Sequence, residues 1–274
     1  MSLLSIITVN YNNANGLQRT IDSVINQQCD WVEFIVIDGC SSDNSSSILK
    51  KNDAEIAFWV SEKDNGIYHA MNKGISHATG EYILFLNSGD HFYDTDSLKN
   101  SKQFLNTYDI LAFDIEVIHE NKKIIKQHPD LVQFSYLYNN TFAHQSTIIK
   151  RTLFSKVGVY DESLKIVADW KFFMDALSKY NVSYSAIHKT LTTYYLDGIS
   201  ATGTGTNQRK KERREILEKE YGLFNNDYEQ LNLMQTNRFK ILRALEKSKM
   251  GRKLLSVLLR IFLFIFKGKQ LKDL

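Results

Sequence analysis

Proline and cysteine are both scarce in this chain of 274 residues. Pro129 is its single proline, and Cys29 and Cys40 are its two cysteines. One proline excludes a proline-rich linker or stalk. Two cysteines cannot form the disulfide framework of a small secreted domain, which favours a reducing compartment. Residues 1–13 show neither a basic start nor a cleavage site of small residues, so we expect a cytoplasmic protein.

Several nucleotide and metal motifs are also missing from the sequence. No Gly-x-Gly-x-x-Gly follows the first predicted strand, which disfavours a dinucleotide oxidoreductase, and no phosphate-binding P-loop motif is present. The seven histidines show no i, i+4 pairing and no cysteine companions, which disfavours a zinc site. What is present is ordinary globular composition, with 43% hydrophobic and 24% charged residues. This length and composition allow one large or two small domains with a proper core.

The formal net charge of +3 conceals an uneven distribution along the chain. Residues 1–208 carry 17 Lys+Arg against 23 Asp+Glu, whereas residues 209–274 carry 17 against 8. After Gln230, eleven basic residues face two acidic ones, Glu246 and Asp273. The sequence therefore predicts an acidic body joined to a basic tail.

The first 90 residues alternate between short apolar runs and segments with helical spacing. Leu17, Ile21, Val24 and Ile25 share one face of a helix. Strands that alternate with helices indicate an α/β fold with a parallel sheet covered on both faces. The predicted strands are 3–9, 34–37, 56–60 and 82–86, and the predicted helices lie at 17–25, near 48 and at 67–78.

Residues 91–208 have a less regular pattern. A strand pair is predicted around a turn at Asn121, and the Gly- and Thr-rich segment 198–207 is expected to be a loop. From Arg209 onward the sequence predicts helix. The other predictions are strands at 110–118, 124–126 and 146–149 and a helix at 170–177.

Polar residues follow the predicted strands at the points where they end. In an open α/β sheet, ligands bind at the carboxyl ends of the strands. A carboxylate there can accept a ribose hydroxyl or an imide N–H, or bind a divalent cation. The segment 64–74 begins a helix that Asp64 can cap, with backbone amides near Gly66 available to a phosphate. The strand-end residues are Asn10, Tyr11, Asn12, Asp38, residues 62–64 and Asp90.

Taken in order, these segments resemble the donor half of family 2 glycosyltransferases, whose fold is called GT-A. Further along, His144-Gln145-Ser146 and Ala168-Asp169-Trp170 resemble the acceptor half. Within the family, the resemblance is to bacterial exopolysaccharide and O-antigen transferases of the colanic acid type. The segments that carry the donor resemblance are 7–12, 37–43, 64–74 and 86–90.

The resemblance implies a Rossmann-like, mostly parallel central sheet flanked by helices. Residues 1–90 would form the donor half and residues 91–208 the acceptor and catalytic-base half. Residues 209–274 would form a helical tail. Two positions depart from the family pattern: Ser88 replaces the first acid of the usual Asp-x-Asp, and His69 stands where many relatives have Asp.

The resemblance also implies site roles. Asp169 would be the general base, and Asp90 would bind Mg²⁺ or Mn²⁺. A cation stabilises the departing diphosphate, and a positioned carboxylate takes the proton of the acceptor hydroxyl. The nucleotide-sugar donor would contact Asn10, Tyr11, Asp38, Asp64, Gly66, Asn72, Lys73, Ser88 and Gly89, and the acceptor side would include His144, Gln145 and Trp170.

The implied reaction is inverting transfer of a sugar, with a UDP-sugar favoured as donor. The implied acceptor is a saccharide linked to polyprenyl diphosphate, in bacterial polysaccharide synthesis. One alternative is a non-catalytic scaffold of a polysaccharide-assembly complex, which the joint presence of Asp90 and Asp169 disfavours. Another is a sugar nucleotidyltransferase, which would need a Gly-rich, basic loop in place of residues 10–16.

The tail from 238 to 266 is predicted as one helix with an interruption at Gly251. Its apolar run 254–266 rises about 20 Å, short of the roughly 30 Å hydrocarbon core, so a spanning helix is disfavoured. A basic helix in the membrane interface fits better, since each Lys or Arg near anionic lipid contributes about 1 kcal/mol. We therefore expect a peripheral protein on the inner face of the cell membrane. Packing on the body or on a second copy is the alternative, and nucleic-acid binding is disfavoured.

Overall fold

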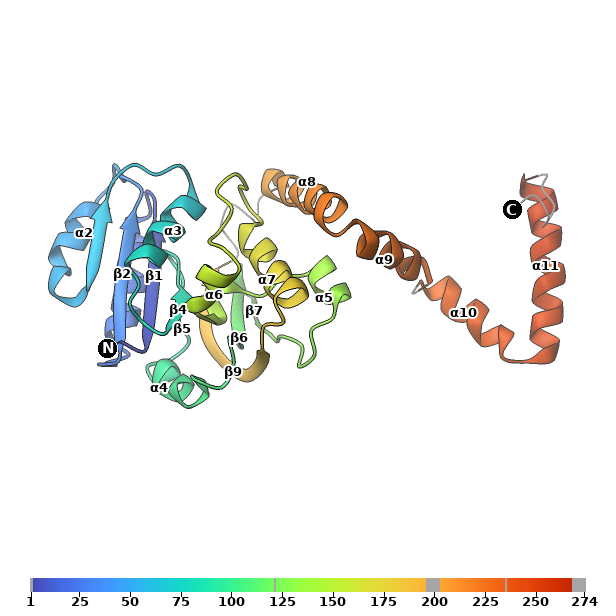
Figure 1. The fold of residues 1–274 in the computed structure, drawn as a ribbon, viewed down its shortest axis with the longest axis horizontal. Coiled ribbons are helices and arrows are strands. Elements are labelled where there is room, and N and C mark those ends of the chain that lie inside the picture. The colour runs from blue at the N-terminus through green and yellow to red at the C-terminus, as the bar shows by residue number, and fades with distance from the viewer. Residues whose placement is uncertain (1, 121, 196–202, 235, 268–274) are drawn as a thin grey trace. The chain divides into compact units, whose positions relative to one another are not determined.

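The computed structural model describes residues 2–120, 122–195, 203–234 and 236–267 (Figure 1). The chain divides into two compact units, Met1–Arg214 and Glu215–Leu274. The first unit is a mixed α/β domain in which helices flank a central sheet (Figure 1). The α/β fold class expected from the sequence is confirmed.

Within the described residues, nine strands form one sheet in the order β3-β2-β1-β4-β8-β6-β9-β5, with β7 paired to β6. The β1–β4 part is parallel throughout, and β8 joins it in the antiparallel direction. The strands are β1 Leu4–Asn10, β2 Val32–Asp38, β3 Phe58–Ser61, β4 Tyr82–Phe85, β5 His91–Phe92, β6 Ile110–His119, β7 Lys122–Lys126, β8 Thr147–Lys150 and β9 Tyr184–Tyr195.

Along the chain, the helices of the first unit alternate with these strands, and the boundary between the two units falls inside α8. Three short 3₁₀ turns complete the set: Asp53–Glu55, Lys102–Phe104 and His144–Ser146. The helices are α1 Ala14–Ile25, α2 Ser45–Lys51, α3 Ile67–His77, α4 Ser97–Ser101, α5 Phe134–Asn139, α6 Thr152–Lys156, α7 Ala168–Lys179, α8 Gly203–Glu220, α9 Gly222–Met234, α10 Asn237–Glu246 and α11 Lys249–Lys267.

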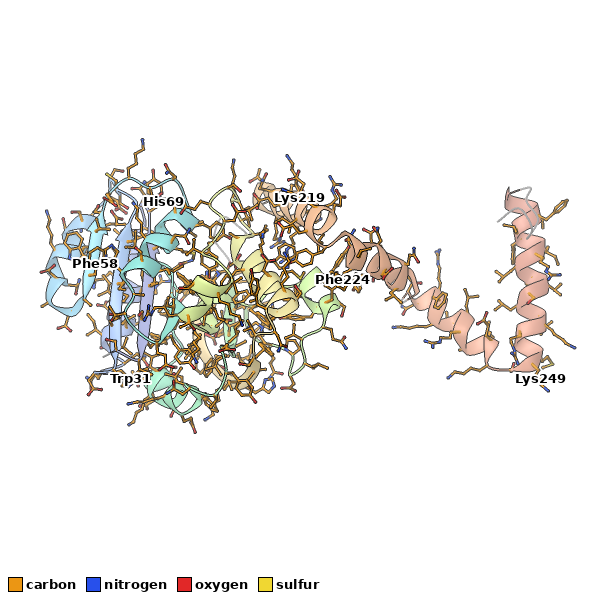
Figure 2. The ribbon with its side chains drawn as sticks, in the orientation of Figure 1. Trp31, Phe58, His69, Lys219, Phe224 and Lys249 are labelled. Atoms are coloured by element: carbon orange, nitrogen blue, oxygen red, sulfur yellow. The ribbon has the colours of Figure 1, made fainter. Side chains whose placement is uncertain are left out.

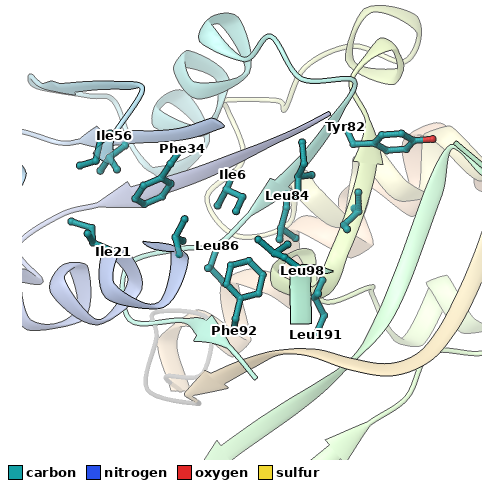
Figure 3. Close-up of a cluster of buried hydrophobic side chains, with 14 of the residues drawn as sticks. Ile6, Ile21, Phe34, Ile56, Tyr82, Leu84, Leu86, Phe92, Leu98 and Leu191 are labelled. Carbon is teal, nitrogen blue, oxygen red and sulfur yellow. The ribbon is translucent and has the colours of Figure 1, made fainter. Parts of the chain in front are cut away.

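Strand β1 lies at the centre of the parallel part, and all seven of its residues are buried. A strand covered on both faces is expected to be mostly apolar, and this one is apolar except for Ser5, Thr8 and Asn10, which are buried as well. The helical face predicted from Leu17, Ile21 and Val24 is buried on α1. These side chains belong to one core cluster with Phe34, Leu84 and residues from β6, β8 and β9 (Figure 3).

The structure departs from the sequence predictions in several places, among them the unpredicted short elements β5, α4, α5 and α6. Strand β9 was not expected at all. The segment 198–207 was expected to be a loop, but α8 already begins at Gly203, and residues 196–202 lie outside the described part. The tail helix was expected to break at Gly251, but the break falls at residues 247–248 and Gly251 lies inside α11.

The break before Gly251 has a local cause. The Gly251 N–H donates to Ser248 Oγ at 2.8 Å, so Ser248 caps the start of α11. A side chain at position 251 would meet the Leu245 carbonyl oxygen at 2.2 Å from its Cβ, so the turn into α11 needs glycine here. The glycine therefore belongs to the first turn of the second helix, and the chain turns just before it.

In the second unit, α11 separates its polar and apolar residues. Lys249, Arg252, Ser256 and Arg260 recur every three or four residues and share one face of the helix. Figure 2 labels Lys249 at the start of this helix. Among the described residues, no helix is both long enough and apolar enough to cross a membrane. The exposed apolar residues of α11 include Leu254, Val257, Leu258, Leu259, Ile261, Phe262, Phe264 and Ile265.

Candidate active site

The carboxyl ends of β1, β2 and β3 meet in register, which pairs Asn10 with Asp38 and Asp38 with Ser61. The Asp38 side chain is fully buried. Its carboxylate accepts hydrogen bonds from Asn10 Nδ2 at 2.7 Å, Ser61 Oγ at 2.5 Å and the Ser41 amide at 3.0 Å. A buried charge requires such donors, so Asp38 holds the strand ends and the loop after β2 together.

Tyr11 and Asp64 come together over Gly39. A Cβ at position 39 would lie 2.5 Å from Asp64 Oδ2 and 3.2 Å from Tyr11 Cδ2, so a larger residue would displace both side chains. Tyr11 is 68% exposed, which leaves its ring available for stacking. Asp64 accepts the Gly66 N–H at 2.9 Å, and Gly66 takes a φ of +120° that favours glycine. An exposed aromatic ring beside a carboxylate can receive a planar base with N–H donors.

Asn72 and Lys73 of α3 have partners within the protein. The Asn72 amide donates to the Tyr160 carbonyl at 2.9 Å, and its oxygen accepts the Tyr160 N–H at 3.0 Å. Lys73 Nζ forms an ion pair with Glu62 at 2.8 Å. Asn72 therefore fastens α3 to the loop before α7, and Lys73 fastens the same helix to the segment after β3.

The turn after β4 is tightly held. Gly89 takes a φ of +106°, and its N–H donates to Thr20 Oγ1 at 3.0 Å. Ser88 Oγ donates to the Asn13 carbonyl at 3.2 Å, and the Asp90 N–H donates to the Asn87 carbonyl at 2.9 Å. These bonds fix the backbone of the turn after β4 against α1 and the residue that precedes this helix.

The same turn offers oxygen atoms of the kind that a hard cation prefers. Asp90 is only 6% exposed, and Asn87 Oδ1 is buried with no hydrogen-bond partner. A carboxylate and an unused amide oxygen suit Mg²⁺ or Mn²⁺. Among the described residues, no group of three or more His, Cys, Asp or Glu could hold a metal ion. A cation at this turn would thus take its remaining ligands from water or from a bound diphosphate.

Asp169 lies at the centre of a hydrogen-bonded chain that joins three elements. Tyr68 Oη of α3 donates to Asp169 Oδ1 at 3.1 Å, and His144 Nδ1 lies 3.2 Å from Asp169 Oδ2. On its other side, His144 Nε2 lies 3.1 Å from Asn87 Nδ2. Because the Asn87 amide donates, Nε2 accepts and the ring proton resides on Nδ1, facing Asp169.

These neighbours control the protonation of Asp169. Burial alone raises the pKa of its carboxyl, but the hydrogen bond from His144, followed by those from the Trp170 amide and the Tyr68 hydroxyl, outweighs burial. The net result is a pKa below the ordinary value of an aspartate. Burial and the charge of Asp169 raise the pKa of Tyr68 well above its usual value, so Tyr68 stays a donor.

Gln145 and Trp170 are both buried beside this chain. Trp170 Nε1 donates to the Leu137 carbonyl at 2.6 Å, which ties α7 to α5. The Arg213 guanidinium lies over the Trp170 ring at 4.8 Å from its centroid. Tyr68 and Arg213 were not singled out from the sequence, because their contacts with residues 169 and 170 have no local pattern.

Known proteins resemble this chain in amino-acid sequence. A family model described as glycosyl transferase family 2 matches residues 5–162. An uncharacterized glycosyltransferase of Mycobacterium tuberculosis is 32% identical over 178 residues, covering 63% of this chain and 68% of the relative. A PGL/p-HBAD biosynthesis glycosyltransferase of Mycobacterium bovis is 28% identical over 207 residues, covering 73% and 80%.

Solved structures share the fold. S. aureus TarS in complex with UDP-GlcNAc aligns with a TM-score of 0.59 at 20% identity, covering 70% of this chain and 58% of that one. In a longer TarS structure the match spans 36% of that chain. The mannosyltransferase PcManGT from Pyrobaculum calidifontis, in complex with GDP-Man and Mn²⁺, aligns with a TM-score of 0.55 at 15% identity, covering 97% and 81%. With more than half of its residues matched by the family model, this chain belongs to glycosyltransferase family 2.

Proposed function

We propose that this enzyme transfers a sugar from a nucleoside-diphosphate sugar to a lipid-linked saccharide, with inversion at the anomeric carbon. A UDP-sugar is the favoured donor, and bacterial polysaccharide synthesis is the favoured setting. Asp169 is the general base in this proposal, and the turn at Asp90 holds a divalent cation.

The observation that carries the proposal is the chain from Asp169 through His144 to Asn87. These hydrogen bonds connect the candidate base to the turn that bears Asp90. The base and the candidate cation site are therefore held together by one continuous set of hydrogen bonds. Glycosyl transfer needs these two groups together, because a proton leaves the acceptor as negative charge develops on the departing diphosphate.

Asp169 can act as a base although both of its oxygens are engaged. Each carboxylate oxygen has two lone-pair positions, and Tyr68 and His144 use one on each oxygen. The side chain is 11% exposed, which leaves an edge for a hydroxyl group. The ionised state is favoured by the lowered pKa, so Asp169 accepts the hydroxyl proton without first having to lose one. When bound, the cation supplies Lewis-acid stabilisation of the leaving diphosphate.

The donor assignment draws support from two sources. Tyr11 and Asp64 both lie over Gly39 at the carboxyl ends of the parallel strands, where a ring and a carboxylate could receive a base. The structural neighbour TarS binds UDP-GlcNAc, and PcManGT binds GDP-Man and Mn²⁺, which supports a nucleotide sugar with a divalent cation. Asp38, which is buried and saturated, would shape this site through Asn10 and Ser41.

The acceptor assignment draws support from the second unit. The polar face of α11 carries Lys249, Arg252 and Arg260, while its other faces are apolar and exposed. A basic, amphipathic helix lies well in the interface of an anionic membrane. An enzyme held at that surface meets lipid-linked saccharides, so we place this protein peripherally on the cytoplasmic face of the membrane.

A panel of nucleotide sugars tests the proposal directly. The full-length protein is screened by thermal shift with Mn²⁺, and each stabilising compound is then assayed for release of the nucleoside diphosphate. We expect one nucleotide sugar to raise the melting temperature and to be hydrolysed slowly, with Mn²⁺ present, when no acceptor is added. Binding without any release, in the presence of membrane extracts that supply acceptors, would favour the scaffold alternative.

A further inference from the structure

Arg213 of α8 is a partly buried cation without an acidic hydrogen-bond partner. Its Nη2 donates to the Asn140 carbonyl at 3.3 Å, its guanidinium stacks over Trp170, and its Nε is buried with no hydrogen-bond partner. The carboxylate that faces it electrostatically is Asp169, whose two oxygens are engaged elsewhere. A buried polar group left unpaired is costly, so an anion that brought an oxygen to this guanidinium would satisfy a donor that the protein leaves without a partner.

Helix α8 is anchored so that Arg213 stays in this position. The neighbouring Glu212 is buried, and its carboxylate accepts the backbone N–H groups of Lys165 at 2.9 Å and Ile166 at 3.1 Å. Those residues belong to the loop that leads into α7 and Asp169. The protein thus uses a buried carboxylate to fix α8 and leaves the adjacent guanidinium without one.

Two further cations share the surroundings of Arg213. Arg209 lies four residues earlier on α8, on the same face of the helix, and Lys126 is the last residue of β7. Burial, opposed by the charge of Asp169 and assisted by the charge of Arg209, lowers the pKa of Arg213 to about 10. Partial desolvation, and then the charges of Arg213 and Arg209, lower the pKa of Lys126, whose side chain keeps an exposed surface. The described residues include no ion pair for any of the three.

We propose that Lys126, Arg209 and Arg213 bind a phosphate or diphosphate group of the acceptor. Three cations without an ion-pair partner among the described residues repel one another, and a multiply charged anion removes that repulsion. Two of the groups are planar guanidinium forks, which match phosphate oxygens. The cluster lies on β7 and α8 beside α5 and α7, all of which follow residue 91, whereas the donor residues Tyr11 and Asp64 come from the β1–β3 edge. This inference rests on the proposed function, because it assigns one anion-binding site to the donor diphosphate and a second one to the phosphate of the acceptor.

The test is isothermal titration of inorganic pyrophosphate into the full-length protein that is already saturated with UDP, with Mg²⁺ in excess over both. We expect one further site in the wild type, with affinity reduced at least tenfold in Arg213→Gln and several-fold in Arg209→Gln and Lys126→Gln. Lys210→Gln, which removes an exposed charge from the same helix, is the matched control and keeps wild-type affinity. Arg209→Gln leaves the stacking on Trp170 intact, so it serves if Arg213→Gln does not fold.

The outcomes distinguish a site for the acceptor phosphate from a site for the donor diphosphate. Affinity for UDP that stays constant across the variants, while pyrophosphate affinity falls, supports the acceptor site. Equal loss of UDP affinity in Arg213→Gln would overturn it, because the cluster would then serve the donor diphosphate. Pyrophosphate binding that is absent in the wild type, or equal in all variants, would also overturn it. A wild type that binds pyrophosphate but neither UDP nor any nucleotide sugar contradicts the proposed function and leaves an anion site in place.

Discussion

The Nδ1 atom of His144 lies 3.2 Å from Oδ2 of Asp169, and the two side chains come from segments 25 residues apart in the sequence. His144 follows β6 and β7 in a short 3₁₀ turn, whereas Asp169 lies in the first turn of α7. Through this contact the His144 ring orients the carboxylate and keeps it ionised. The acceptor-side role expected for His144 is a separate prediction, and the geometry adds a positioning role to it.

Replacing Asp169 by Asn is expected to reduce transfer by about 10²–10⁴-fold, because the amide cannot take a proton from the acceptor hydroxyl. Its shape and its contact with Tyr68 are preserved, so UDP affinity should stay within about twofold of wild type. Steady-state kinetics and a UDP titration measure the two effects. Asp161→Asn, a change at an exposed turn before the same helix, is the control. Transfer at the wild-type rate by Asp169→Asn would remove Asp169 from the mechanism.

Replacing His144 by Phe is expected to move the acidic limb of the pH–rate profile toward higher pH. His144 is the main group that lowers the pKa of Asp169 against the effect of burial, so its loss lets that pKa rise. A base works only when ionised, and kcat/KM then begins to fall at a higher pH than in the wild type. His144→Gln, which retains an N–H donor, should shift the limb less. An unchanged limb in His144→Phe would show that His144 does not control the ionisation of Asp169.

The parallel half of the sheet follows closely from the sequence. Buried strands such as β1 are mostly apolar, and the apolar face of α1 has regular spacing, so local pattern and tertiary position agree. Strand β9 was missed because its burial is uneven, with two exposed residues in its middle. Helix α8 was predicted to start at Arg209, since Gly203 and Gly205 each disfavour helix by about 1 kcal/mol. Gly205 is buried in the structure, so packing overrides that propensity.

The candidate site was predictable where it lies at strand ends. Asp38 directly follows an apolar run and Asp90 follows one after a short polar turn, and parallel topology brings such strand ends together. The contacts of Asp169 were not predictable, because Tyr68 lies 101 residues away in the sequence and no periodicity links the two. Arg213 was counted among the charges of a helical tail. Its burial over Trp170 depends on the tertiary position of α8, which composition cannot reveal.

Chelation of divalent cations with EDTA is expected to abolish transfer, and added Mn²⁺ should restore it. The turn at Asp90 supplies few anionic ligands, since Ser88 occupies the position of a second acid. Ser88→Asp should therefore lower the Mn²⁺ concentration for half-maximal activity by about tenfold, because a further carboxylate strengthens a hard-cation site. Asp90→Asn should raise that concentration. Full activity in EDTA would contradict the assignment of Asp90 to a cation.

Burial of the neutral His128 ring leads us to expect a loss of folding stability in mild acid. Burial, followed by the charge of Lys126, lowers the pKa of His128 to about 4, and its Nε2 is buried without a partner. The unfolded chain takes up a proton below about pH 6.5, whereas the folded chain resists until about pH 4. The free energy of unfolding should fall by about 3 kcal/mol across that interval. His128→Phe, which keeps the ring packing on Phe142, should flatten this part of the profile; an unchanged slope would show that other groups cause it.

Attachment to anionic lipid is expected to depend on the apolar side of α11. Leu258 lies on that side and is 49% exposed, so it would enter the interface, whereas Ser256 lies on the basic face. Leu258→Gln should weaken binding to vesicles of phosphatidylcholine and phosphatidylglycerol by about tenfold, since it removes one buried leucine. Ser256→Gln likewise leaves the charge of the helix unchanged and should bind as wild type does. Deletion of residues 236–274 should abolish sedimentation with these vesicles, and high salt should weaken it in the intact chain. Sedimentation that survives the deletion would place the lipid contact elsewhere, and binding that is equal for neutral and anionic vesicles would exclude the basic face from it.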